Sequence, residues 1–330
     1  MLSLTERSMS KEIGGYLELE QFNGVSFHED GIALNCGRGC LSYLIELRGI
    51  RSIWLPDFMC DSVYERFEQE NVIIKSYPIS SLLTPDYSKI SLSPSDWLYL
   101  NDYYGTLSEA DVSLALSISG GRLIVDETQG YFRKPWQDAD TIYTCRKWLG
   151  VPDGGYVYTK DKRQLDRPLP KDVSYSRMIY VLGRFEETAS EFYELSQENN
   201  NFFSRQPAKV MSRITSNLLK AIDYEKVQFM RFCNWEILSN RLYSFNKLNL
   251  KMPTSAPFMY PLYLDSADGI REKLAQKKIY IPTLWPNVAE KNDDTQACDF
   301  AKNILPLPVD QRYGAEEMEM ILEAVYPCLR

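Results

Sequence analysis

The sequence predicts an α/β protein in which helices cover a mostly parallel sheet, followed by a smaller α+β domain. Three observations lead to this prediction. Strand-like apolar runs alternate with helix-like segments in the first half of the chain, the pattern becomes helical over 187–246, and alternation returns near the C-terminus. Continuous apolar strands between amphipathic helices are typical of parallel sheets covered on both faces. We expect a large domain over 1–250, with an N-terminal arm over 1–30, and a small domain over 251–330.

Seven strands are expected in the large domain. Each is a short run rich in β-branched and aromatic residues that ends at a polar residue or a turn. The expected strands span 32–37, 52–58, 72–79, 97–105, 122–127, 141–145 and 155–159. Sheets of this kind bind ligands at the carboxyl ends of their strands. Asp126 stands at such an end, so this edge is where we expect a functional site.

The second half of the chain is expected to begin with helices. Apolar residues over 187–246 recur three and four positions apart, which predicts helices that pack along the large domain. Pro253 and Pro257 then mark a boundary, because proline interrupts helices. Strand-like "YPLYL" and "NILPLPV" alternate with helix-like segments in the remainder, which predicts the small α+β domain.

Composition excludes several classes of function. The 330 residues are 44% hydrophobic and carry a net charge of −8, whereas a general nucleic-acid binder needs a basic surface. We find no apolar run of membrane-spanning length and no secretory signal. Seven cysteines without a disulfide pattern favour the cytoplasm. The only histidine is His28, which argues against a histidine triad or metal cluster; we expect Cys36 and Cys40 of "CGRGC" to be buried thiols.

The stretch "VDETQG" places Asp126 directly after a buried strand. A buried carboxylate without a partner is costly, so Asp126 needs a cation, a ligand or hydrogen-bond donors. Taken alone, the motif allows a metal ligand, a base, the partner of a protonated ring nitrogen, or a structural cap or ion pair.

Two further features accompany this carboxylate. Gly37 and Gly39 of "NCGRGC" let the backbone approach a ligand, and the following helix presents N–H groups to an anion; such turns are also common without a ligand. Lys147 of "TCRKWLGVPDGG" follows the next strand and is either a Schiff-base amine or a solvated lysine. Together, an anion cradle, a carboxylate and an amine are what pyridoxal 5′-phosphate requires.

These motifs resemble those of the DegT/DnrJ/StrS family of pyridoxal-phosphate-dependent sugar aminotransferases, over most of the chain. "LNCGRGCLSYLI" is similar to the family's phosphate loop and helix, and "IVDETQG" to its Asp-x-x-(Gln or His) motif. "CRKWLGVPDGG" resembles its lysine followed by a glycine pair, and "NILPLPVDQRYGAEEMEMI" its last strand and helix. The resemblance implies the aspartate-aminotransferase-like fold (fold type I) with pyridoxal 5′-phosphate as the cofactor.

The resemblance also implies roles for individual residues. Asp126 would pair with the pyridine nitrogen, Gln129 would contact the face or phenolic oxygen of the ring, and Lys147 would be the Schiff-base lysine. The remaining implied cofactor-binding residues are Gly37, Arg38, Gly39 and Thr144 at the phosphate and Phe58 stacked on the ring.

Two departures from the family pattern stand out. Cys36 and Arg38 occupy positions where the family usually has serine or threonine beside its glycine, although an arginine can bind phosphate through two donors. Residues 160–246, where contacts to the sugar and the partner subunit are expected, match the family poorly.

The implied activity is transfer of an amino group from an amino acid, expected to be glutamate, to a keto sugar that is expected to be nucleotide-linked. We expect a homodimer that binds small-molecule substrates and neither nucleic acid nor membranes. Two alternatives remain open: another pyridoxal-phosphate-dependent reaction on the same fold, or a non-catalytic regulatory or binding protein. The presence of Asp126, Gln129 and Lys147 argues against the second alternative.

Overall fold

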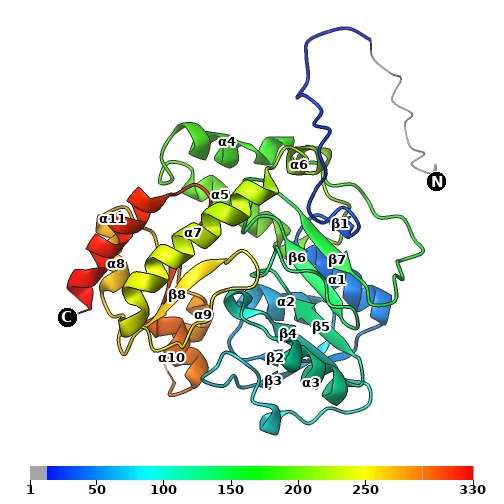
Figure 1. The fold of residues 1–330 in the computed structure, drawn as a ribbon. Coiled ribbons are helices and arrows are strands. Elements are labelled where there is room, and N and C mark those ends of the chain that lie inside the picture. The colour runs from blue at the N-terminus through cyan, green and yellow to red at the C-terminus, as the bar shows by residue number, and fades with distance from the viewer. Residues whose placement is uncertain (1–12, 292, 330) are drawn as a thin grey trace.

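One seven-stranded sheet organises the computed structural model, which describes residues 13–291 and 293–329 (Figure 1). Its strands are β1 (Ile32–Leu34), β2 (Ser52–Pro56), β3 (Ile73–Tyr77), β4 (Trp97–Asn101), β5 (Leu123–Asp126), β6 (Asp140–Thr144) and β7 (Gly155–Tyr158). They lie in the order β1-β7-β6-β5-β4-β2-β3; β7 pairs antiparallel with β1 and with β6, and the other neighbouring strands pair in parallel. The expected mostly parallel sheet is therefore confirmed.

Helices cover both faces of this sheet. Successive side chains of each strand point to opposite faces, so each strand contributes to two layers of packing. On one face, residues of α1 (Gly37–Arg48) and α2 (Asp61–Gln69) form a buried cluster with Tyr99 and Ile124. On the other face, residues of α3 (Glu109–Ser119) pack in a cluster that includes Leu123. Strands such as β5 are thus buried on both faces, which explains their continuously apolar sequences.

Four helices follow the sheet: α4 (Ile179–Glu186), α5 (Tyr193–Phe202), α6 (Arg213–Leu219) and α7 (Tyr224–Leu242). We expected this region to pack along the large domain, and it does so only in part. Val227 of α7 joins the core of the large sheet, whereas Trp235 and Leu238 belong to the core of the C-terminal part. The long helix α7 thus contributes to both cores.

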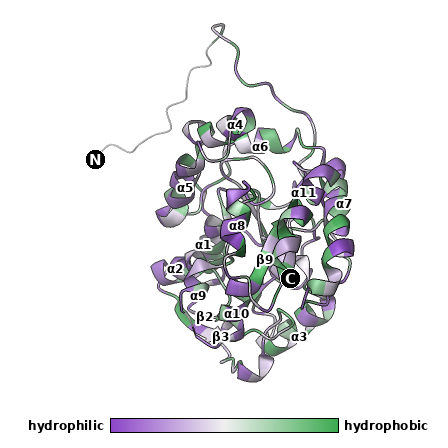
Figure 2. Ribbon diagram, turned by 90° about the vertical axis from the view of Figure 1, so that its left-hand side faces the viewer, coloured by the Kyte–Doolittle hydropathy of each residue, from purple (hydrophilic) through white to green (hydrophobic). Residues whose placement is uncertain are grey.

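The C-terminal part is built on a two-stranded antiparallel sheet of β8 (Met259–Tyr263) and β9 (Ile304–Pro308). Its helices are α8 (Ile270–Gln276), α9 (Pro286–Ala289), α10 (Gln296–Asn303) and α11 (Ala315–Val325). Figure 2 shows strand β9 as a hydrophobic element in the interior. Trp285 and Phe300 of this part pack into the core of the large sheet, so the two cores adjoin and the expected boundary near 250 stays a prediction.

The expected N-terminal arm lies partly outside the described residues. From residue 13 onward it extends away from the body of the molecule (Figure 1). Ile13, Tyr16 and Leu17 are more than 90% exposed. Asn217 then holds the arm at two points: its side-chain NH₂ donates to the Glu20 carbonyl at 2.8 Å, and its side-chain oxygen accepts from the Phe22 amide at 2.9 Å. Among the described residues, no helix is long and apolar enough to cross a membrane.

His28 is buried among aromatic rings near the edge of the sheet. Its Nε2 lies 2.7 Å from the Tyr131 carbonyl oxygen and its Nδ1 lies 3.3 Å from the Tyr158 hydroxyl. A neutral imidazole that donates from Nε2 and accepts at Nδ1 satisfies both contacts. Burial lowers the pKa of His28 to about 4, although the hydrogen bond to Tyr131 acts to raise it.

We therefore expect acid to destabilise the protein through His28. Its folded pKa lies below the unfolded value, so the unfolded state binds the proton first and stability falls as pH falls from about 6.5 to about 4. The contribution is roughly 3 kcal/mol. Because His28 is the only histidine, its NMR ring signal can be followed directly, and a titration midpoint near 6.5 in the folded protein would contradict this assignment.

Candidate active site

Asp126 ends β5 with its carboxylate buried, at 3% exposure. Oδ1 accepts a hydrogen bond from the Thr128 amide at 2.8 Å, and Oδ2 accepts one from the Tyr99 hydroxyl on the neighbouring strand β4. None of the ion pairs found within 13–291 and 293–329 involves Asp126. The site therefore presents a buried negative charge that two donors orient and no cationic side chain pairs.

Lys147 lies in the loop after β6, and its side chain is exposed. Nζ donates to the Thr128 hydroxyl at 2.9 Å, and the Trp148 indole donates to the Thr128 carbonyl at 3.0 Å. Thr128 thus contacts Asp126 through its amide and Lys147 through its hydroxyl. The structure brings together the carboxylate and the amine that the sequence singled out.

Gln129 lies in the same turn and is buried. Its side-chain oxygen accepts a hydrogen bond from the Tyr104 amide at 2.9 Å. Tyr104 follows β4 with a left-handed φ of 57°, which directs this amide out of the regular strand. Because the carbonyl of Gln129 is engaged, a contact from Gln129 to a ligand would use its NH₂ group.

The glycine turn before α1 lies against the same residues. The Cys36 sulfur accepts from the Gly39 amide at 3.3 Å and caps the helix. A Cβ atom on Gly37 would lie 3.9 Å from Thr128 and 4.0 Å from Thr144. The first turn of α1, whose leading N–H groups have no partner within the helix, therefore faces the threonines that flank Asp126 and Lys147.

Gly39 and Thr144 have structural contacts of their own. A Cβ on Gly39 would overlap the Asn35 side chain, so glycine is required for the packing of this turn. Thr144 is buried, and its hydroxyl donates weakly to the Gly154 carbonyl at 3.4 Å. Thr144 also borders the start of α1, since a Cβ on Gly37 would lie 4.0 Å from its side chain.

Arg38 points to the helical region rather than across the glycine turn. Nη1 donates to the Ser204 hydroxyl at 3.0 Å, and Nη2 donates to the carbonyl and side-chain oxygens of Asn200, both at 2.8 Å. Burial lowers the pKa of Arg38. Its guanidinium therefore ties α1 to the end of α5 and to the following 3-10 turn η4 (Phe203–Arg205).

Phe58 lies in the core after β2. It is 0% exposed, stacks on Tyr103 with ring centroids 5.2 Å apart, and meets the edge of Trp285 at 4.9 Å. These rings enclose it. Two positions later, burial raises the pKa of the Cys60 thiol, and the charges of Lys147 and Asp126 both act on that pKa.

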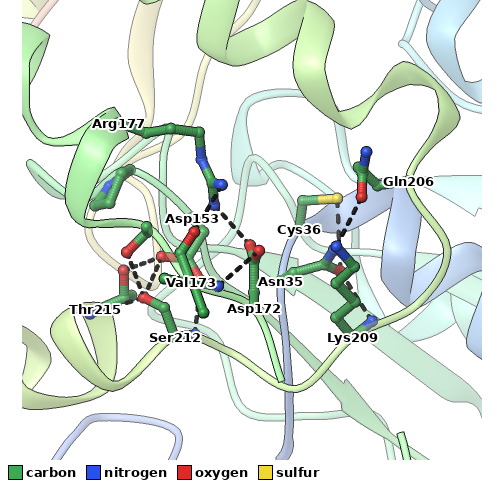
Figure 3. Close-up of polar contacts among 12 residues, drawn as sticks. Asn35, Cys36, Asp153, Asp172, Val173, Arg177, Gln206, Lys209, Ser212 and Thr215 are labelled. Atoms are coloured by element: carbon green, nitrogen blue, oxygen red, sulfur yellow. Dashed lines mark hydrogen bonds and ion pairs between the residues drawn. The ribbon is translucent and has the colours of Figure 1, made fainter. Parts of the chain in front are cut away.

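The loop that carries Lys147 is anchored at its far end by Asp153 (Figure 3). Asp153 is fully buried and accepts hydrogen bonds from the amide and hydroxyl of Ser212, at 2.8 and 2.7 Å, and from the Thr215 hydroxyl. Next to it, the Gly154 amide donates to the Asn35 carbonyl at 2.6 Å. The lysine loop is thereby fixed both to α6 and to the turn before α1.

The glycine pair makes this close approach possible. Gly154 has a φ of +115°, and a Cβ on Gly155 would lie 2.9 Å from both the Cys40 sulfur and the Tyr143 carbonyl oxygen. We expect Gly155→Ala to lower the free energy of unfolding by about 1–3 kcal/mol through overpacking, measured by urea denaturation. Gly150→Ala is the matched control, because its Cβ would meet only Val181 at 3.5 Å; equal stability of the two variants would contradict this account.

Glu127, the neighbour of Asp126, serves a different purpose. It is fully buried beside Asp102, and burial raises its pKa well above the ordinary value. The Trp136 indole donates to Glu127 at 2.6 Å, and Arg133 lies 3.3 Å from Asp102. This network links the residues that follow β4 and β5 to the segment 133–136.

A cavity of about 680 Å³ lies between α3 and the segment 132–138. It is lined by Thr254 and Ser255 as well, and by none of the residues that the sequence analysis assigned to a site. The cavity and the candidate site are therefore different places on the molecule.

Sequence reasoning missed three residues that the structure places at or near the site. Thr128 stood inside the motif but carried no assigned role, although its position between Asp126 and Gln129 was a signal. Tyr99 becomes a partner of Asp126 only through the pairing of β4 with β5. Arg146, next to Lys147, gave no signal of its own in the sequence.

Comparison with solved structures identifies the fold. DesV from S. venezuelae, in complex with a ketimine intermediate, matches with a TM-score of 0.66 and 14% identity, over 91% of this chain and 85% of that one. The putative sugar aminotransferase Spr1654 from Streptococcus pneumoniae, in its PLP form, matches with a TM-score of 0.64 and 13% identity, over 88% and 85%. NtdA from Bacillus subtilis, with bound cofactor PMP, matches with a TM-score of 0.63 and 13% identity, over 90% and 73%.

These matches confirm the expected aspartate-aminotransferase-like fold. No protein-family model and no curated protein matches the sequence. At identities this low the likeness concerns the fold, and function must be argued from the site itself.

Proposed function

We propose that this protein is a pyridoxal 5′-phosphate-dependent aminotransferase that moves an amino group from glutamate to a nucleotide-linked keto sugar. One observation carries the proposal: Asp126 is buried without an ion pair, and Thr128 hydrogen-bonds both to its carboxylate and to the amine of Lys147. The names of the similar structures, which include sugar aminotransferases, support the substrate class.

The residues of the site fit this cofactor. Asp126 offers an unpaired carboxylate to a protonated ring nitrogen, and the start of α1 with Thr144 offers donors to a phosphate. Lys147 offers an amine to an aldehyde, and the NH₂ group of Gln129 can donate to the ring oxygen. When bound, the cofactor supplies an electron-accepting ring that stabilises negative charge on the carbon bearing the amino group.

Each residue then has a defined part in the chemistry. With the cofactor bound, Lys147 Nζ would move a proton from the α-carbon of the amino donor to the cofactor carbon that carried the aldehyde, and the Thr128 hydroxyl would keep the Lys147 amine beside the site. Asp126 would keep the ring nitrogen of the cofactor protonated. Burial raises the pKa of Tyr99 well above its ordinary value, so Tyr99 stays protonated and continues to donate to Asp126.

The test is a half-reaction followed by absorbance. The purified protein, loaded with pyridoxal 5′-phosphate, should be yellow and should lose this colour with glutamate; a nucleotide-linked keto sugar should restore it. Failure to bind the cofactor would favour a cofactor-free binding protein. Cofactor binding without colour loss for any amino acid would favour a different reaction on the same fold.

We also propose a homodimer located in the cytoplasm. All seven cysteines are free, which fits a reducing compartment. Helix α4 exposes Ile179, Leu182 and Phe185, the last at 92%, and the N-terminal arm exposes further apolar residues. Apolar surface of this kind suits association with a second copy.

Light scattering should therefore give the mass of a dimer. Changing Leu182 and Phe185 together to aspartate should yield a monomer, because charges would enter the apolar contact. Phe229→Asp on α7 is the control, since Phe229 is also exposed, at 66%, and lies outside the proposed surface. A wild-type monomer with full activity would contradict the dimer.

A further inference from the structure

We propose that Arg146 binds the phosphate group of the cofactor together with the start of α1 and Thr144, while Arg38 of α1 and Arg66 of α2 hold the end of α5 and η4 in place. The inference deepens the proposed function and rests on it.

Three arginine side chains contact the same short segment, residues 203 and 204. Arg38 donates to the Ser204 hydroxyl, and Arg66 donates to the carbonyl oxygens of Phe203 and Ser204 at 3.2 and 3.0 Å. The Arg146 guanidinium lies 5.0 Å from the Phe203 ring centroid. All three charges act on the thiol of Cys36, the cap of α1, although burial is the larger influence and raises its pKa.

The three arginines differ in how their donors are used. Arg38 and Arg66 are engaged with oxygens of α5 and η4. Arg146 makes no hydrogen bond or ion pair within the described part of the chain, and its Nε is buried without an acceptor. Arg66 Nε is likewise buried without an acceptor, in a side chain that is 4% exposed. The three arginines therefore carry more hydrogen-bond donors than the surrounding residues have acceptors for.

Negative charge is also missing there. Of the carboxylates in the described ranges, only Glu70 reaches one of these arginines, at 3.7 Å from Arg66. A cluster of three cations with one distant carboxylate is unusual in a chain with a net charge of −8. The geometry thus calls for an anion from outside the chain.

A phosphate monoester matches this demand. It carries nearly two negative charges and several acceptor oxygens, and it binds well to an arginine fork and to a helix N-terminus. Arg146 stands between Thr144, which borders Gly37 at the start of α1, and Lys147, which would hold the aldehyde of the same cofactor. The aldehyde and the phosphate-bearing arm of the cofactor are attached to adjacent ring carbons, so neighbouring residues would hold these two groups.

The experiment compares pyridoxal 5′-phosphate with pyridoxal, which lacks the phosphate, in absorbance titrations. Wild-type protein should bind the phosphorylated form more tightly. Arg146→Gln should weaken binding of pyridoxal 5′-phosphate about 10- to 100-fold, the loss of one charged hydrogen bond, and leave pyridoxal binding unchanged. Arg205→Gln, which removes an exposed arginine of η4, is the control and should keep the preference.

Arg38→Gln tests whether Arg38 has a structural role while Arg146 binds the phosphate. It should lower the melting temperature, because α5 loses its attachment to α1, and keep the preference for the phosphorylated form. The inference is overturned if Arg146→Gln keeps the preference, if it weakens both ligands equally, or if Arg38→Gln is the variant that loses the preference.

Two further results distinguish the phosphate of the cofactor from that of a nucleotide, and a failure of this inference from a failure of the proposed function. UDP, a nucleoside diphosphate, should not displace pyridoxal 5′-phosphate from the wild type; if Arg146→Gln abolished UDP binding and spared the cofactor, Arg146 would belong to the sugar-nucleotide site. Wild-type protein that binds neither cofactor form would overturn the proposed function together with this inference.

Discussion

Replacing Lys147 by arginine should reduce amino transfer by at least about 10³-fold, because a positioned acid–base group alone contributes about 10²–10⁴-fold. Arginine keeps the positive charge and can still donate to Thr128, but it can neither form the covalent link to the cofactor nor accept a proton near neutral pH. The rate should be measured in a single turnover with glutamate and divided by the amount of bound cofactor.

A chemical label tests the same residue independently. Borohydride should fix the pyridoxal ring to the protein, and peptide mapping should find it on "KWLGVPDGG", the fragment that begins at Lys147. Lys89→Arg is the control for the Lys147→Arg substitution, because Lys89 is exposed and distant in sequence from Lys147. This control variant should keep the wild-type rate of amino transfer. A label on any lysine other than Lys147 would overturn the assignment.

Asp126→Asn should lower kcat by about 10²–10³-fold, the usual effect of removing one preorganised charge contact. A neutral amide cannot hold the ring nitrogen protonated, and the negative charge that this nitrogen stabilises develops mainly in the transition state. The start of α1 and Lys147 are untouched, so the cofactor should still bind. Single-turnover rates normalised to bound cofactor measure the effect.

The alternative role of Asp126 makes a different prediction. If its carboxylate only capped the turn at Thr128, the variant would lose stability and keep its rate per loaded molecule. Asp138→Asn, at an exposed position, controls for the loss of one negative charge. A near wild-type rate for Asp126→Asn would mean that this carboxylate does not pair with the ring nitrogen.

The sequence predicted the parts of the molecule that depend on local patterns. The strands could be recognised because their apolar runs are buried on both faces of a parallel sheet. Asp126 and Lys147 could be placed at one edge because each follows one of two consecutive strands, and the structure shows them joined by Thr128.

The remaining parts depend on contacts between distant segments. The direction of Arg38 is set by Asn200 and Ser204, more than 160 positions away, and the partnership of Tyr99 with Asp126 is set by strand register. Phe58 aligned with a ring-stacking position, but the core formed with Tyr103 and Trp285 encloses it. Periodicity and spacing carry no information about such long-range choices.

The antiparallel strand β7 also constrains when the site can form. β1 pairs with β7, with Ile32 opposite Val157, and Leu34 forms a further bridge with Val210, so the turn before α1 cannot take its final place until the chain has been synthesised beyond residue 210. Closing a loop of this length is slow compared with forming the adjacent β6–β7 hairpin. On a ribosome the lysine loop would therefore be organised first and the glycine turn before α1 would join it, so the proposed cofactor could stabilise only a nascent chain in which both are present.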